Sequence, residues 1–285
     1  MPVDMSPPPR GPVPSPTASQ GRIARAIWIR AVADKAGITG VLAFYLLAIG
    51  AGMGALWPPL RETFVSLAHS LPSGFDALLG GVPLSTPAGW LNAELLSMLA
   101  PGFLIATALI SGASATAGEE QSRTMALVLS TGTARTTFLL AKSAAVLTHV
   151  VVVALAMFVG LLAGNAIGDM GLSTSTLLDV TVWATLIALP YAALTLTVGA
   201  LSGRRRPSLA IPGGVVGVSF VLSMFLPLNP SLTGLAKINL WYPYSGNVAI
   251  VNGIDWAVGA FILILTAVIA LVGIASFPRR QNLHG

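Results

Sequence analysis

The chain has 285 residues, of which 54% are hydrophobic and only 9% are charged, and its mean hydropathy is +0.81. Because a soluble domain carries about 25% charged residues, this composition excludes an ordinary water-facing surface and predicts a protein that lies in lipid. The absence of cysteine excludes disulfides, thiol nucleophiles and Cys-ligated metal sites, and the net charge of +5 arises from basic residues beside hydrophobic stretches, which indicates membrane orientation rather than nucleic-acid binding.

The N-terminal region precedes the first hydrophobic stretch. Residues 1–20 are rich in proline and serine, which predicts a disordered cytoplasmic tail. In residues 21–36, Ile23, Ile27 and Trp28 share one helical face while arginines point away from it. This pattern is typical of an amphipathic helix that lies on the membrane surface. The alternative is a plain cytoplasmic extension of the first span.

Six windows without charge follow, and each is long enough for a membrane-spanning helix. About 20 apolar residues cross a hydrocarbon core of roughly 30 Å, and a charge at its centre costs about 2.5–3.5 kcal/mol. We therefore predict an all-α, polytopic membrane protein with one transmembrane domain over residues 37–280 and a tail over residues 281–285. The predicted spans lie near residues 38–58, 93–115, 143–167, 178–201, 208–228 and 255–277.

The basic residues are distributed asymmetrically about these spans. All but Arg61 and Lys237 fall on one side of a six-span arrangement. They are Arg10, Arg22, Arg25, Arg30, Lys35, Arg123, Arg135, Lys142, Arg204, Arg205, Arg206, Arg279 and Arg280. Since cytoplasmic loops are enriched in Lys and Arg, both termini are predicted to be cytoplasmic, in a cell (inner, cytoplasmic) membrane.

Two loops fall on the predicted outer side. The first, residues 59–92, contains several prolines and is expected to be irregular. The second, residues 229–254, contains Trp241, Tyr242 and Tyr244 with little charge. These aromatics suit a belt at the outer interface, and a short or re-entrant helix is the alternative.

A charged elbow, residues 116–142, connects the second and third predicted spans. Thr116 followed by Glu119 matches a capping box, and acidic residues in a first turn favour the helix dipole. A short helix over about 117–130 is therefore expected, ending at the Thr131-Gly132-Thr133 break. Its apolar patch would consist of Met125, Val128 and Leu129. Such a surface helix either receives a soluble partner or is an ordinary solvated loop.

The elbow also resembles a known signature. The residues concerned are Gly118-Glu119-Glu120, Arg123-Thr124, Arg135 and Lys142, with a short apolar run between them. In this order and position they resemble the permeases of ABC type 2 exporters, and the similarity in topology extends over residues 21–280. Many members have a proline after the apolar run, where this chain has Thr131-Gly132.

The resemblance implies a permease subunit that forms the translocation path as a homodimer or with a second permease subunit, and that is driven by a separate ATP-binding cassette ATPase. It implies ATPase coupling through Gly118, Glu119, Glu120, Arg123, Thr124 and Arg135. None of the three lysines follows a glycine, so the chain lacks a P-loop and is not expected to be an enzyme. No cofactor is expected in this chain, since ATP and Mg would bind the partner. The apolar spans favour a hydrophobic or amphipathic cargo.

Other readings use the same residues differently. Glu119-Glu120 followed by Arg123 resembles the motif of intramembrane CAAX-type proteases, but the arginine comes one residue early and only His149 lies within a span. A secondary transporter usually has ionisable groups near the membrane midplane, whereas the predicted spans carry their carboxylates at their ends. A non-transporting membrane scaffold or immunity-type protein is the remaining alternative.

Overall fold

The computed structural model describes residues 16–70, 82–121, 124–130, 132–226, 230–232, 234 and 239–279, and these contain helices and turns but no strand. The long helices are α1 (Pro16–Ser70), α4 (Leu99–Ala113), α7 (Arg135–Ile167), α8 (Thr174–Ser202), α9 (Arg205–Phe225) and α13 (Trp256–Ser276). The short α-helices are α3 (Pro87–Leu91), α5 (Glu119–Gln121), α6 (Thr124–Ser130), α11 (Tyr242–Ser245) and α12 (Ala249–Asn252). The π-helices are η1 (Asn92–Leu96) and η2 (Ser114–Gly118), and the 3-10 helices are η4 (Pro230–Leu232) and η5 (Phe277–Arg279).

The prediction of an all-helical protein with six membrane-length helices is confirmed. Among the described residues, six helical stretches are long and apolar enough to cross a membrane. They are Gln20–Ser66, Pro87–Gln121, Arg135–Ile167, Thr174–Ser202, Arg205–Phe225 and Trp256–Ser276. Each predicted span falls on one of these stretches, and only the spans 208–228 and 255–277 overrun their helices, by one to three residues.

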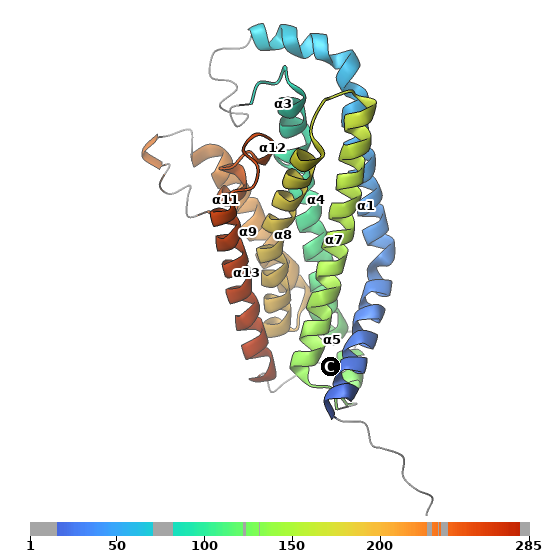
Figure 1. Cartoon of the computed structure of the whole chain (residues 1–285). Helices are drawn as coiled ribbons and strands as arrows, with labels where there is room; N and C mark the ends of the chain where they lie inside the picture. The colour runs from blue at the N-terminus through green and yellow to red at the C-terminus, as the bar shows by residue number, and fades with distance from the viewer. Residues whose placement is uncertain are drawn as a thin grey trace, which may run out of the picture.

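Helix α1 is longer than expected at both ends. It begins at Pro16, inside the predicted tail, and continues without a break through the predicted interfacial stretch and the first span. It also passes through Pro58 and Pro59 and ends at Ser70, inside the loop predicted over 59–92. A proline removes a hydrogen bond and bends a helix without necessarily ending it. In Figure 1 the last part of α1 lies across one end of the bundle.

The helices pack side by side around α8 (Figure 1). Helix α8 contacts α4, α7, α9 and α13, and its apolar window is the most buried of the six. The windows of α1, α9 and α13 are the least buried and present apolar side chains to the outside. Exposed apolar faces of this extent would be unstable in water and suit contact with lipid.

Glycines bring α1 and α7 into close contact. Gly50 and Gly54 on α1 face Gly160 and Gly164 on α7, with a period of four residues on both helices. A Cβ atom built on Gly54 would lie 1.9 Å from the Gly164 carbonyl oxygen. Small residues at this spacing let two membrane helices approach backbone to backbone.

Two of the three aromatic residues of the second predicted outer loop pack against the rest of the bundle. Trp241 and Tyr244 are buried, and only Tyr242 is partly exposed. Trp241 packs edge-on against Phe220 and Tyr244, with ring centroids 5.3 and 6.0 Å away. The short helices α11 and α12 hold this cluster against α8.

Candidate functional site

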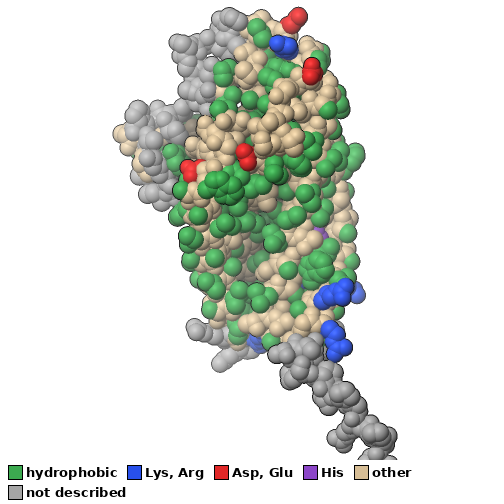
Figure 2. Space-filling view, viewed as in Figure 1, with side chains coloured by type: hydrophobic (Ala, Val, Ile, Leu, Met, Phe, Trp, Pro, Cys, Tyr) green, Lys and Arg blue, Asp and Glu red, His purple; other side chains and the backbone are tan. Residues whose placement is uncertain are grey.

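The two ends of the bundle differ in charge. One end carries the start of α1, the end of α13 and the elbow between α4 and α7, and basic side chains gather there (Figures 1 and 2). The described basic residues at this end are Arg22, Arg25, Arg30, Lys35, Arg135, Lys142, Arg204, Arg205 and Arg206. Acidic side chains appear at the opposite end in Figure 2. The elbow therefore lies in the strongly basic end, which is the candidate site.

The elbow begins as a continuation of α4 rather than as a newly capped helix. Helix α4 passes through the π-helix η2 directly into α5. The Thr116 hydroxyl is buried and donates to the Gly112 carbonyl oxygen at 3.2 Å. The predicted capping box is therefore wrong, because Thr116 lies within a helix and makes a hydrogen bond one turn back. π-turns occur frequently where a helix contributes to a functional site.

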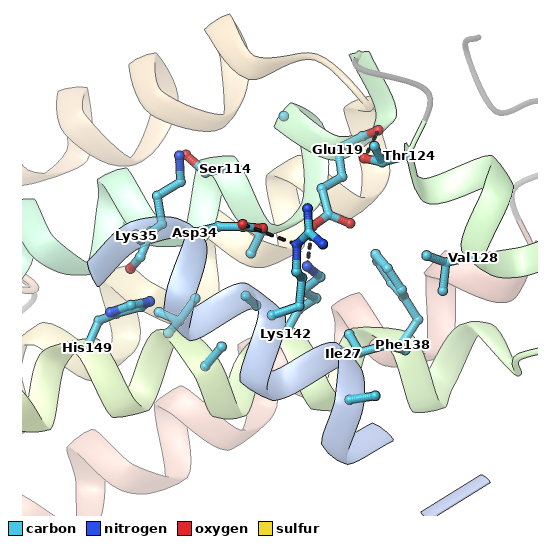
Figure 3. Close-up of a pocket in the computed structure, with 18 of the residues that line it drawn as sticks. Ile27, Asp34, Lys35, Ser114, Glu119, Thr124, Val128, Phe138, Lys142 and His149 are labelled. Carbon is cyan, nitrogen blue, oxygen red and sulfur yellow. Dashed lines mark hydrogen bonds and ion pairs between the residues drawn. The ribbon is translucent and has the colours of Figure 1, made fainter. Parts of the chain in front are cut away.

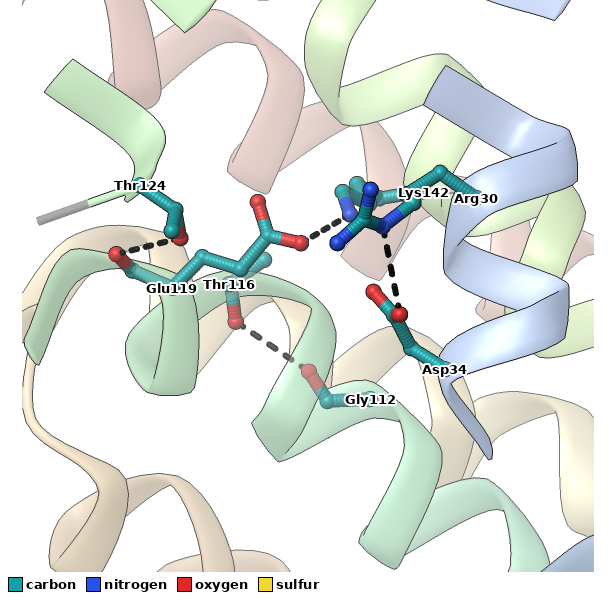
Figure 4. Close-up of polar contacts among 7 residues, drawn as sticks. All are labelled: Arg30, Asp34, Gly112, Thr116, Glu119, Thr124 and Lys142. Carbon is teal, nitrogen blue, oxygen red and sulfur yellow. Dashed lines mark hydrogen bonds and ion pairs between the residues drawn. The ribbon is translucent and has the colours of Figure 1, made fainter. Parts of the chain in front are cut away.

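An ion pair connects α5, the first short α-helix of the elbow, to α7. The Lys142 ammonium on α7 pairs with the Glu119 carboxylate on α5 (Figure 4), and the Lys142 side chain is only 3% exposed. The ammonium also lies 5.5 Å from the centre of the Phe138 ring, within reach of a cation–π interaction. A buried lysine without a counter-charge would be costly, so this pair fixes α5 against α7.

The predicted coupling residues differ in their surroundings. Glu119 is partly buried and Glu120 is buried. Thr124 is exposed, and its hydroxyl donates to the Glu119 carbonyl oxygen at 3.2 Å. Gly118 has room for a Cβ at ordinary contact distance, so packing does not require glycine there. Arg123 lies outside the described residues.

The predicted coupling residue Arg135 joins the elbow to the end of the chain. Its guanidinium donates to the carbonyl oxygens of Phe277 and Pro278 at 3.4 and 3.5 Å, and it lies 6.0 Å from the centre of the Phe277 ring. The first turn of α7 and the segment after α13 are thus held together.

The apolar patch expected on the elbow helix packs inside this chain. Met125 on α6 is buried in a small core with Ile27, Phe138 and Phe277, and Val128 and Leu129 pack against it. Gly132 follows with a φ of 80°, as the predicted break requires. The patch therefore anchors α6, and any partner would meet the polar face of the elbow.

A cavity of about 900 Å³ lies beside the ion pair, between α1, α4, α6, α7 and the start of α9 (Figure 3). Four cationic side chains and two carboxylates line it. They are Arg30, Lys35, Lys142 and Arg205, with Asp34 and Glu119. The sequence did not predict that Arg30, Lys35 and Arg205 converge, because they lie on helices that are distant in the chain.

At the inner part of this cavity, His149 of α7 is hydrogen-bonded to Thr39 of α1. The Thr39 hydroxyl oxygen and the His149 Nδ1 atom are 2.8 Å apart. Within the described part of the chain, no group of three or more His, Asp or Glu side chains is placed to hold a metal ion. The site thus consists of ion pairs and a basic cavity, an arrangement suited to binding and to mechanical linkage between helices.

Taken together, these contacts link the elbow to α1, α7 and the end of the chain.

Comparison of the whole chain with models of protein families, with curated proteins and with solved structures finds no match.

Proposed function

We propose that this protein is the membrane-spanning permease subunit of an ABC type 2 exporter, and that a separate ATPase binds at the elbow. The observation that carries the proposal is the elbow itself, in which the Glu119–Lys142 pair connects two long helices at the basic end of the bundle. The elbow signature described above contains both members of this pair.

The contacts around the elbow support a mechanical role. Helix α5 continues α4 through η2, and it is held to α7 by the ion pair. Arg135 then connects α7 to the segment after α13. A force applied to the elbow would therefore move α4 and α7 together, instead of only deforming a loop.

The proposed cycle takes its energy from the partner. ATP binding closes the two ATPase subunits, their movement shifts the two elbows, and the helices of two permease copies rearrange to open a path. Exposed polar positions of the elbow, including Gln121 and Thr124, are the surface that such a partner would contact.

Co-purification tests the proposal. The tagged protein, extracted from its native membrane in mild detergent, is expected to retain a P-loop protein that hydrolyses Mg-ATP. Arg123→Ala is expected to lower its recovery about fivefold or more, since an interface arginine often contributes over 1 kcal/mol. Arg61→Ala, an exposed arginine at the opposite end of the bundle, serves as the control. A preparation without ATPase, or equal loss in both variants, would contradict the proposal.

A further inference from the structure

The cavity beside the elbow has more positive than negative side chains. Arg30 pairs with Asp34 at 3.3 Å, and Lys142 pairs with Glu119 (Figure 4). Lys35 and Arg205 also line the cavity, but neither makes a hydrogen bond or an ion pair with any described residue. Two cations therefore face the same half-open cavity without a carboxylate partner among the residues that the structure describes.

The inner wall of the cavity offers a further polar group. The His149 Nδ1 atom is hydrogen-bonded to the Thr39 hydroxyl, and the Nε2 atom of the same ring is buried. Figure 3 shows His149 and Lys35 at the same end of the cavity.

The remaining walls are apolar. Ala115, Phe138 and Val146 line the space next to the charged groups. Lys35 precedes the first predicted span by three residues, which puts the cavity at the expected depth of the lipid headgroups. A ligand suited to this site has an anionic group at one end and an apolar part beside it.

We propose that the cavity binds the phosphate group of an anionic phospholipid. The phosphate would lie between Lys35 and Arg205, on the side of the cavity where His149 lies, and the glycerol and upper acyl region would contact the apolar walls. Basic pockets between membrane helices on the cytoplasmic side bind such headgroups. The proposal does not depend on export, because it needs only the cavity, its depth in the membrane and its place on the cytoplasmic side.

Native mass spectrometry of the full-length protein in detergent tests this proposal. Titration with phosphatidylglycerol is expected to give a dissociation constant at least about tenfold lower than titration with phosphatidylcholine, since each basic residue near the surface contributes about a fivefold gain. Lys35→Gln and Arg205→Gln are each expected to weaken phosphatidylglycerol binding about fivefold. Lys35→Arg should retain binding.

Matched controls lie at the same end of the bundle. Arg25 and Arg206 are exposed and do not line the cavity, so Arg25→Gln and Arg206→Gln should change binding less than about twofold. Equal affinity for both lipids would contradict the proposed lipid site. An equal loss of phosphatidylglycerol affinity in the control and cavity variants would contradict it too. Competition by glycerol 3-phosphate at the same concentration as the lipid would show a site for a soluble phosphate and overturn the lipid assignment. None of these lipid-binding measurements involves an ATPase, so a negative result would contradict the lipid site without affecting the exporter proposal.

Discussion

At the scale of single residues, Lys142 is a buried cation at the basic end of the bundle. Its side chain is 3% exposed, yet it carries a charge that must be compensated within the protein. The Glu119 carboxylate and the Phe138 ring supply that compensation from α5 and from α7 itself. Removing only one partner of a buried ion pair leaves an uncompensated charge, whereas removing both does not.

Neutralising Glu119 should therefore cost more than neutralising the pair. We expect Glu119→Gln to lower the free energy of unfolding by about 2–3 kcal/mol, because Lys142 remains buried without a counter-charge. The double variant Glu119→Gln/Lys142→Met should recover most of that loss. Thermal unfolding in mild detergent measures both effects. Strictly additive losses would show that the two side chains do not depend on each other.

Tyr244 is a buried polar residue near the opposite end of the bundle. Its hydroxyl donates to the Leu96 carbonyl oxygen, and burial raises the pKa of the phenol, so it stays protonated. Tyr244→Phe should lower the free energy of unfolding by about 1–2 kcal/mol, because the Leu96 oxygen loses its buried donor. Tyr242→Phe is the control, since the Tyr242 hydroxyl makes no hydrogen bond to a described residue. Equal unfolding midpoints for the two variants would contradict the assigned role.

At the scale of helices, the contact between α1 and α7 determines how the first span joins the bundle. Gly54 and Gly164 face each other with no room for a side chain, whereas Gly52 on another side of α1 has no atom within 4 Å of a built Cβ. The space at Gly54 therefore admits no side chain, whereas the space at Gly52, two positions earlier on the same helix, is open.

The matched pair Gly54→Ala and Gly52→Ala tests this contact. We expect Gly54→Ala to lower stability by about 1–3 kcal/mol, because its methyl group would overlap the α7 backbone. Gly52→Ala should be neutral or stabilising by up to about 1 kcal/mol, through the better helix propensity of alanine. Thermal unfolding in detergent, followed by size-exclusion chromatography, distinguishes them. Equal unfolding midpoints for the two variants would show that Gly54 does not lie in the contact between α1 and α7.

Comparison of the predicted and observed helices shows what the pattern of apolar residues determines. The charge-free windows identified all six membrane-length helices. They did not predict that α1 continues beyond Pro58, or that α4 runs through η2 into α5. A proline or a Thr-x-x-Glu pattern is a local signal, and contacts made by other helices decide whether the chain stops or continues there.

The candidate site was predictable only in part. The elbow residues are close in the chain, so their position between two spans followed from the sequence. The cavity brings together Lys35, Lys142 and Arg205 from three helices, and no local pattern reports that convergence. The glycine periods on α1 and α7 were the available signal that these two helices lie side by side.

At the scale of the whole molecule, both the start of α1 and the end of α13 lie at the basic end with the elbow. Both proposals require this end to face the cytoplasm, where an ATPase has its ATP and where the anionic lipids are abundant. The positive-inside rule favours this orientation. Both proposals therefore depend on the six-span topology with the elbow on the cytoplasmic side.

Labelling of single cysteines tests this topology without interference, because the chain has no cysteine of its own. Gln121→Cys marks the exposed end of α5, and Ser175→Cys marks an exposed position at the start of α8, at the other end of the bundle. In intact cells, a membrane-impermeant maleimide is expected to label Ser175→Cys, and to label Gln121→Cys only after the membrane is permeabilised. Labelling of Gln121→Cys from outside sealed cells would contradict the account.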